Sequence, residues 1–131
     1  MNNLNPNSIP ILTLAYLGDS VYETMVRDHL VRRLNARPDA LHEEQLKMSN
    51  AAFQAEAAQA IIPFLTEGEL DILRAGRNAK TSHRPKGGTV AQYHAATGLE
   101  ALFGRLWLDG NKKRLDELFD IIADSGVNNV D

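Results

Sequence analysis

Residues Leu14–Glu23 read LAYLGDSVYE and place Gly18 and Asp19 inside an otherwise apolar run. The apolar residues recur at roughly helical spacing from Leu14 to about residue 34, which predicts a long helix. Asp19 is unusual there, because burying an unpaired carboxylate is strongly unfavourable. Gly18 costs about 1 kcal/mol relative to alanine inside a helix. We therefore expect either a close approach of another segment or a junction of two helices at this point.

A second isolated acid lies 81 residues later, at Glu100 in TGLEALFGRLWL. None of its neighbours one helical turn away is basic. The residues alone leave alternatives open, since Asp19 could cap a helix and Glu100 could lie on an exposed stripe. If the two acids meet, they repel each other unless a cation lies between them. A hard divalent ion such as Mg²⁺ fits that place, because it takes oxygen ligands and keeps several waters.

The composition is that of an ordinary globular chain of 131 residues with a net charge of −3. We expect one domain over residues 1–131, with its core at about 10–125. The chain has no cysteine, which excludes disulfides and thiolate metal sites and fits a cytoplasmic location. No stretch has the pattern of a secretory signal or the length of a membrane span.

Helix signals dominate, and no segment shows strand alternation over a useful length, so we predict an all-α fold. The expected helices run from a Ser8 cap to about residue 34, from Asp39 to about Met48, from a Ser49 cap to Pro63, from a Thr66 capping box to Gly76, from a Thr89 capping box to Leu108, and onward from an Asn111 cap. An exposed loop is expected from Gly76 to Gly88.

Basic residues gather in one part of this acidic chain. The stretch from Ile72 to Leu99 has no acid and carries +5, so the remainder carries −8. Such a patch indicates an anionic partner, although a simple solvated surface is the alternative. The candidate phosphate-binding residues are Arg74, Arg77, Lys80, Arg84 and Lys86.

Both acidic motifs match a known family. LAYLGDSVYE resembles the signature helix of the ribonuclease III catalytic domain, with its Leu-Gly-Asp core, and TGLEALFG resembles that family's second motif. Together with GRNAK and YHAATGLEALFG, the chain is most similar to the mini-ribonuclease III branch, which lacks a double-stranded-RNA-binding domain. The resemblance extends from about Leu12 to Leu118.

The resemblance implies a homodimeric all-α endoribonuclease that cleaves double-stranded RNA to 5′-phosphate and 3′-hydroxyl ends, with Mg²⁺ that Mn²⁺ can replace. Asp19 and Glu100 match the catalytic, metal-binding acids, and Asn78 in GRNAK joins the RNA-binding candidates. The implied substrate is precursor ribosomal RNA of the large subunit (23S).

Ala15 and Thr97 occupy positions where larger family members carry two more acids. We therefore expect one well-held ion per site, with a second only when RNA is present. The alternatives are a non-catalytic dimeric RNA-binding protein of the same fold, or a protein-interaction module in which Asp19 is only a cap.

Overall fold

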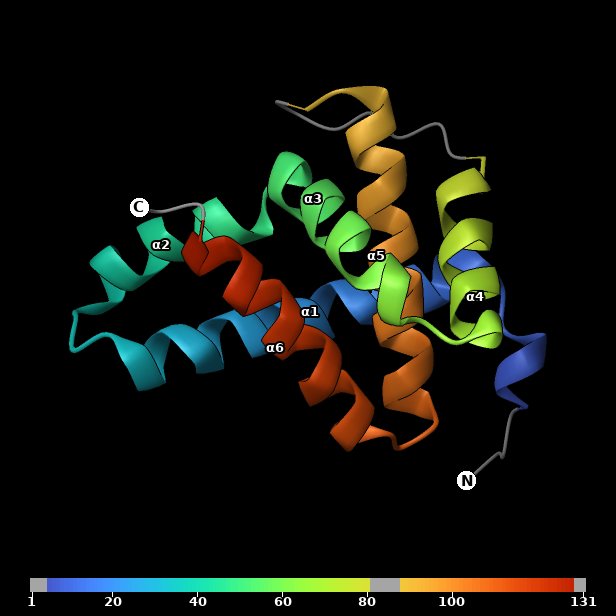
Figure 1. The fold of residues 1–131 in the computed structure, drawn as a ribbon, viewed down its shortest axis with the longest axis horizontal. Coiled ribbons are helices and arrows are strands. Elements are labelled where there is room, and N and C mark those ends of the chain that lie inside the picture. Colours follow the sequence, from blue (N-terminus) through green and yellow to red (C-terminus); the bar gives the residue numbers. More distant parts are fainter. Residues whose placement is uncertain (1–4, 81–87, 129–131) are drawn as a thin grey trace.

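The computed structural model describes residues 5–80 and 88–128. Within these ranges the regular structure is entirely helical, which confirms the predicted all-α fold (Figure 1). The elements are η1 (Pro6–Ser8), α1 (Ile11–Arg33), α2 (Pro38–Ser49), α3 (Ala51–Ile61), η2 (Ile62–Phe64), α4 (Glu67–Asn78), α5 (Val90–Leu108) and α6 (Lys112–Asn128). None of the described helices is both long enough and apolar enough to cross a membrane.

Helix α5 is the centre of the fold. α1, α3, α4 and α6 all pack against it, and Figure 1 shows α3 and α4 on either side of it. Its middle is buried on nearly every side, as expected for a helix that is apolar all round. Tyr22 of α1 and Phe103 of α5 are fully buried and meet edge to face with ring centroids 5.7 Å apart.

Helices α1 and α5 cross with their backbones in direct contact. A Cβ atom on Gly18 would lie 1.6 Å from the carbonyl oxygen of Glu100, and one on Gly104 would lie 2.0 Å from the carbonyl oxygen of Leu14. Gly18 therefore serves the close approach, and α1 runs through it without a break. Asp19 lies in the interior of that helix, so the reading of Asp19 as a helix cap is wrong.

Helices α4 and α5 make a second close crossing, which corrects the role expected for Gly76. A Cβ on Gly76 would lie 2.7 Å from the Cα of Gly98, so the residue is needed for packing. α4 continues past it and ends at Asn78. The loop predicted from Gly76 therefore begins later, and Arg77 and Asn78 belong to the helix.

The predicted caps Thr66, Thr89 and Asn111 are confirmed, and α2 begins at Pro38, one residue before the expected Asp39. Thr66 and Thr89 both form complete capping boxes. Ser8, by contrast, lies in η1 and does not cap α1. The cap of α3 is Asn50, whose side chain accepts a backbone N–H of the first turn at 2.8 Å, whereas Ser49 ends α2. The misplaced cap of α3 reflects competition between two neighbouring polar residues that are both suited to the position, whereas α1 begins after Pro10 without any side-chain cap.

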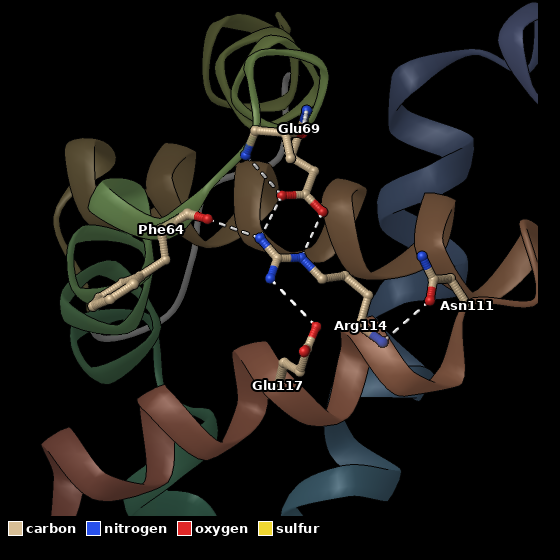
Figure 2. A network of polar contacts seen from close by, with 6 residues as sticks. Phe64, Glu69, Asn111, Arg114 and Glu117 are labelled. Atoms are coloured by element: carbon tan, nitrogen blue, oxygen red, sulfur yellow. Dashed lines mark hydrogen bonds and ion pairs between the residues drawn. The ribbon is translucent and has the colours of Figure 1, made fainter.

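One ion pair ties α4 to α6, and we call it the Glu69–Arg114 clamp (Figure 2). Arg114 Nε and Nη2 each donate to a different carboxylate oxygen of Glu69 at 2.8 Å. Nη2 also donates to the Phe64 carbonyl oxygen at 2.8 Å, and Nη1 approaches Glu117 at 3.4 Å. The Arg114 guanidinium lowers the pKa of Glu69 below its ordinary value. In this clamp Arg114 balances the charge of Glu69, and the carboxylate holds α4 and α6 together.

Candidate active site

The α1–α5 crossing brings the two isolated acids together. Asp19 follows Gly18, and the backbone of Glu100 is the surface on which Gly18 packs. The two carboxyl groups lie within hydrogen-bonding reach of each other. Asp19 is exposed, whereas Glu100 is partly buried. Residues 81 positions apart in the sequence thus form one site that opens to solvent on the Asp19 side.

The electrostatics of Glu100 are those of a buried acid beside another acid. Burial is the largest cause, followed by the charge of Asp19 and a hydrogen bond with Asp19, and together they raise the pKa of Glu100 to about 9. A hydrogen bond from Gln54 acts in the opposite direction. Burial, and then the charge of Glu100, also raise the pKa of Tyr22. A carboxyl group with a pKa this far from its ordinary value is characteristic of a functional site.

The donor set of this site fits a hard divalent cation. Among residues 5–80 and 88–128, no ion pair of the protein includes Asp19 or Glu100. Two carboxylates in contact, without a cationic partner from the described chain, supply oxygen ligands and unbalanced negative charge. No group of three or more His, Cys, Asp or Glu side chains with metal-binding geometry occurs in the same ranges. The arrangement therefore suits an ion such as Mg²⁺, whose remaining ligands are water or phosphate oxygens.

The residues one helical turn before Asp19 and before Glu100 are buried and carry no charge. Ala15 is 7% exposed and Thr97 is 6% exposed. The Thr97 hydroxyl donates to the carbonyl oxygen of Tyr93 in its own helix, at 3.0 Å. No further carboxylate ligand comes from these two positions.

Two buried glutamines beside the acids were missed by reasoning from sequence. Gln45 of α2 donates through Nε2 to Glu23 Oε1 at 2.5 Å, and Gln54 of α3, which is 4% exposed, acts to lower the pKa of Glu100. Glu23 lies one turn after Asp19 on α1. The available signal was Gln54 itself, a long polar side chain within a helix that is otherwise rich in alanine.

The structure places four of the six RNA-binding candidates at the end of α4. Arg74 and Asn78 are exposed, Arg77 is partly buried, and Lys80 is exposed just beyond the helix. Their helix is held against α5, because a Cβ on Gly98 would lie 3.2 Å from the backbone nitrogen of Arg77. The other two candidates, Arg84 and Lys86, lie outside the described residues.

Comparisons with known proteins identify the family. Residues 12–111 match the Ribonuclease III domain family. The chain is 45% identical to a Mini-ribonuclease 3 of Symbiobacterium thermophilum, over 95% of both chains. It is 35% identical to a Mini-ribonuclease 3 of Staphylococcus aureus, over 93% of this chain and 95% of that one. A protein of Fusobacterium nucleatum known from a crystal structure matches with a TM-score of 0.81 at 27% identity, over 91% of this chain and 95% of that one. The chain therefore belongs to the ribonuclease III family, in its mini-ribonuclease III branch, and is an endoribonuclease.

Proposed function

We propose that this endoribonuclease hydrolyses phosphodiester bonds of double-stranded RNA with Mg²⁺, and leaves 5′-phosphate and 3′-hydroxyl ends. The ribonuclease III family acts on double-stranded RNA and generally depends on a divalent metal. The observation that carries the proposal is the contact between Asp19 and Glu100, two acids with no cationic partner among the described residues. Mn²⁺ has the same preference for oxygen ligands and is expected to substitute.

The carboxylates of Asp19 and Glu100 would hold the ion. When bound, a divalent ion stabilises negative charge on a phosphate and makes water a stronger acid. Glu100 ligates only after losing its proton, which burial and Asp19 oppose. The backbone contact at Gly18 keeps the two acids in place. A cation at this site would replace the proton that Glu100 otherwise keeps, and the exposed Asp19 lies on the side open to solvent, where RNA would bind.

The end of α4 would bind the RNA backbone. Arginine can form paired hydrogen bonds to phosphate, and lysine acts as a point charge. The proposed RNA-binding residues are Arg74, Arg77, Asn78 and Lys80, together with Arg84 and Lys86 from outside the described ranges. Because such contacts are electrostatic and RNA duplexes are recognised largely by shape, we expect strong salt dependence and weak sequence preference.

We further propose that the active form is a homodimer. Tyr16 is 83% exposed and Leu12, one turn earlier on α1, is 40% exposed. Both lie on the helix that carries Asp19, so a large aromatic side chain faces solvent beside the site. A two-fold axis would supply one site for each strand of a duplex.

The substrate and compartment belong to the same proposal. Precursor ribosomal RNA of the large subunit (23S) is the substrate that the family resemblance supports. We place the activity in the cytoplasm, in keeping with a sequence without cysteine. The catalytic unit would be the whole of residues 1–131, with a core at about 10–125.

A cleavage assay tests the proposal. A long RNA duplex is incubated with the protein at low salt, with Mg²⁺ or with EDTA, and products are resolved on a denaturing gel. We expect cleavage only with the metal, and a loss of about a thousandfold in Asp19→Asn and Glu100→Gln. Glu67→Gln, at an exposed acid of α4, serves as the control and should cleave normally. Near-normal rates in either site variant, or RNA that is bound but never cut, would contradict the proposal.

A further inference from the structure

Glu23 is a third acid beside the site, one helical turn after Asp19. Helix α1 is continuous through both residues, and side chains four residues apart on a helix are neighbours, with Cβ atoms about 5–6 Å apart. Helical side chains also lean toward the N-terminus of their helix, so the side chain of Glu23 leans over the turn that carries Asp19. The turn on the other side of Asp19 offers no side-chain oxygen at the corresponding position, because Ala15 stands there.

One carboxylate oxygen of Glu23 is held in place, and the other is available. Gln45 Nε2 of α2 donates to Glu23 Oε1 at 2.5 Å, and Arg27 Nη2 donates to the same oxygen at 3.3 Å. In residues 5–80 and 88–128, no hydrogen bond or ion pair uses Glu23 Oε2. The carboxylate therefore has a fixed orientation and one oxygen that can accept a further bond.

Gln45 is the residue that fixes this orientation. It is 5% exposed and is the buried residue of α2, and burying an amide without a partner costs about 1–3 kcal/mol. Arg27 contributes less, because its side chain is 62% exposed and an exposed ion pair is worth at most about 1 kcal/mol. The buried amide thus holds Glu23 more firmly than the exposed arginine does.

We propose that Glu23, held by Gln45, is a positioning residue that accepts a hydrogen bond through Oε2 from a water ligand of the divalent ion. This inference rests on the proposed metal-dependent function. Mg²⁺ keeps several of its waters, and a site with two protein carboxylates leaves most ligand positions to water. Water on a divalent cation is a stronger acid and therefore a stronger hydrogen-bond donor. Acceptors one step behind the ligands commonly tune such sites.

Contact through water, and not direct ligation, suits the surroundings of Glu23. In the described ranges, no group of three or more His, Cys, Asp or Glu side chains has the geometry to hold a metal ion. Arg27 also lies 3.3 Å from Glu23 Oε1, and a positive neighbour opposes direct binding of a cation by the same carboxylate. Accepting a hydrogen bond from water requires only the available Oε2.

Mn²⁺ affinity without RNA, measured by electron paramagnetic resonance at fixed pH, tests the inference. We expect Glu23→Gln, which keeps the length of the side chain and removes the carboxylate, to lower the affinity by at least about tenfold. Gln45→Met keeps Glu23 but releases its carboxylate, and should lower the affinity by a smaller factor. Circular dichroism verifies that the variants are folded.

Asp28→Asn is the matched control for the loss of charge. Asp28 also pairs with an arginine one turn later on α1, Arg32, at 2.8 Å, and it lies farther than Glu23 from Asp19 along the helix. This variant should bind Mn²⁺ as the parent protein does.

A second measurement uses the parent protein and requires no variant to fold. In ¹⁵N–¹H spectra, the side-chain amide signals of Gln45 should shift when Mg²⁺ is added, because Gln45 bonds the carboxylate that accepts from the ion's water. Those of Gln59, exposed on α3, should not shift.

Three results would overturn the inference: Gln45 signals that do not respond to Mg²⁺, parental Mn²⁺ affinity in Glu23→Gln or Gln45→Met, or an equal loss of affinity in Asp28→Asn. Failure of the parent itself to bind Mn²⁺ would instead overturn the proposed metal site, and this inference with it.

Discussion

Glu69 and Glu100 are both partly buried glutamates on helices that pack into the core, but their surroundings shift their pKa values in opposite directions. Glu69 lies in the Glu69–Arg114 clamp, where a guanidinium binds both of its oxygens and lowers its pKa. Glu100 faces Asp19, and burial together with that second acid raises its pKa to about 9. The first arrangement stabilises the fold, whereas the second is a source of instability.

The difference distinguishes a carboxylate that is paired within the fold from one that is proposed to bind a metal ion. Burial by itself does not separate the two residues. The partner does, because a paired acid has its charge balanced within the protein and has little to offer a ligand. An acid held against another acid keeps its proton until a cation replaces it. This contrast leads to three predictions about stability.

The largest effect is expected for Gly18→Ala, which separates the helices that carry the acid pair and leaves the clamp untouched. The added methyl group would lie 1.6 Å from the Glu100 carbonyl oxygen, which is backbone and cannot move aside. We expect a loss of at least about 3 kcal/mol in the free energy of unfolding, measured by urea denaturation.

Gly68→Ala is the control for this change, since Gly68 is also helical but has nothing within 4 Å of its added Cβ. That substitution should stabilise the protein by about 0.5–1 kcal/mol. Equal effects of the two substitutions would mean that the α1–α5 contact is looser than described.

An intermediate effect is expected in the pH dependence conferred by Glu100. The folded protein keeps this proton up to about pH 9, whereas the ordinary value for glutamic acid is 4.5. The folded state therefore binds more protons between these values, and its stability falls as pH rises, by up to about 1.4 kcal/mol per pH unit. We expect a loss of about 2 kcal/mol between pH 6 and pH 8 in EDTA, allowing for partial solvation.

Glu100→Gln should remove most of that slope, and Mg²⁺ should reduce it in the parent protein, because the ion stabilises the ionised carboxylate. Denaturation curves at several pH values provide the measurement. A parent protein whose stability stays flat or rises over this range would show that Glu100 is already ionised without metal.

The smallest effect is expected for Glu69→Gln, which weakens the clamp and should leave RNA cleavage unchanged. The ion pair is largely shielded, with side-chain exposures of 12% for Glu69 and 21% for Arg114. We expect a loss of about 1.5 kcal/mol in the free energy of unfolding at pH 7. Because the pKa of Glu69 is lowered, the contribution is present above its ordinary value of 4.5 and disappears as pH falls below it.

Lys47→Met, which breaks an exposed pair with Glu44 in α2, serves as the matched control and should cost less than about 0.5 kcal/mol. A clamp variant as stable as this control would remove the contrast with Glu100. Reduced cleavage by a stable Glu69→Gln protein would extend the role of the clamp to the proposed RNA-binding end of α4.

The sequence by itself indicated the helices and singled out Asp19 and Glu100 as two isolated acids in apolar segments. The capping boxes at Thr66 and Thr89 are local signals, because the groups that bond lie within a few residues of each other. The gap expected between about residue 34 and Asp39 is also a local signal. Asp19 and Glu100 were recognisable because an isolated carboxylate in an apolar segment requires a partner or a function. Local signals failed where polar neighbours compete, as at Ser49 and Asn50.

Only the tertiary structure decided which residues meet. The contact of Asp19 with Glu100 depends on a backbone crossing at Gly18. Gly76 could be read as a helix stop until its packing partner Gly98 was known, because a glycine is locally suited to both roles. The sequence showed Gln54 only as a polar residue in an alanine-rich helix. Its burial on α3, which packs against α5, is a property of helices brought together by the fold.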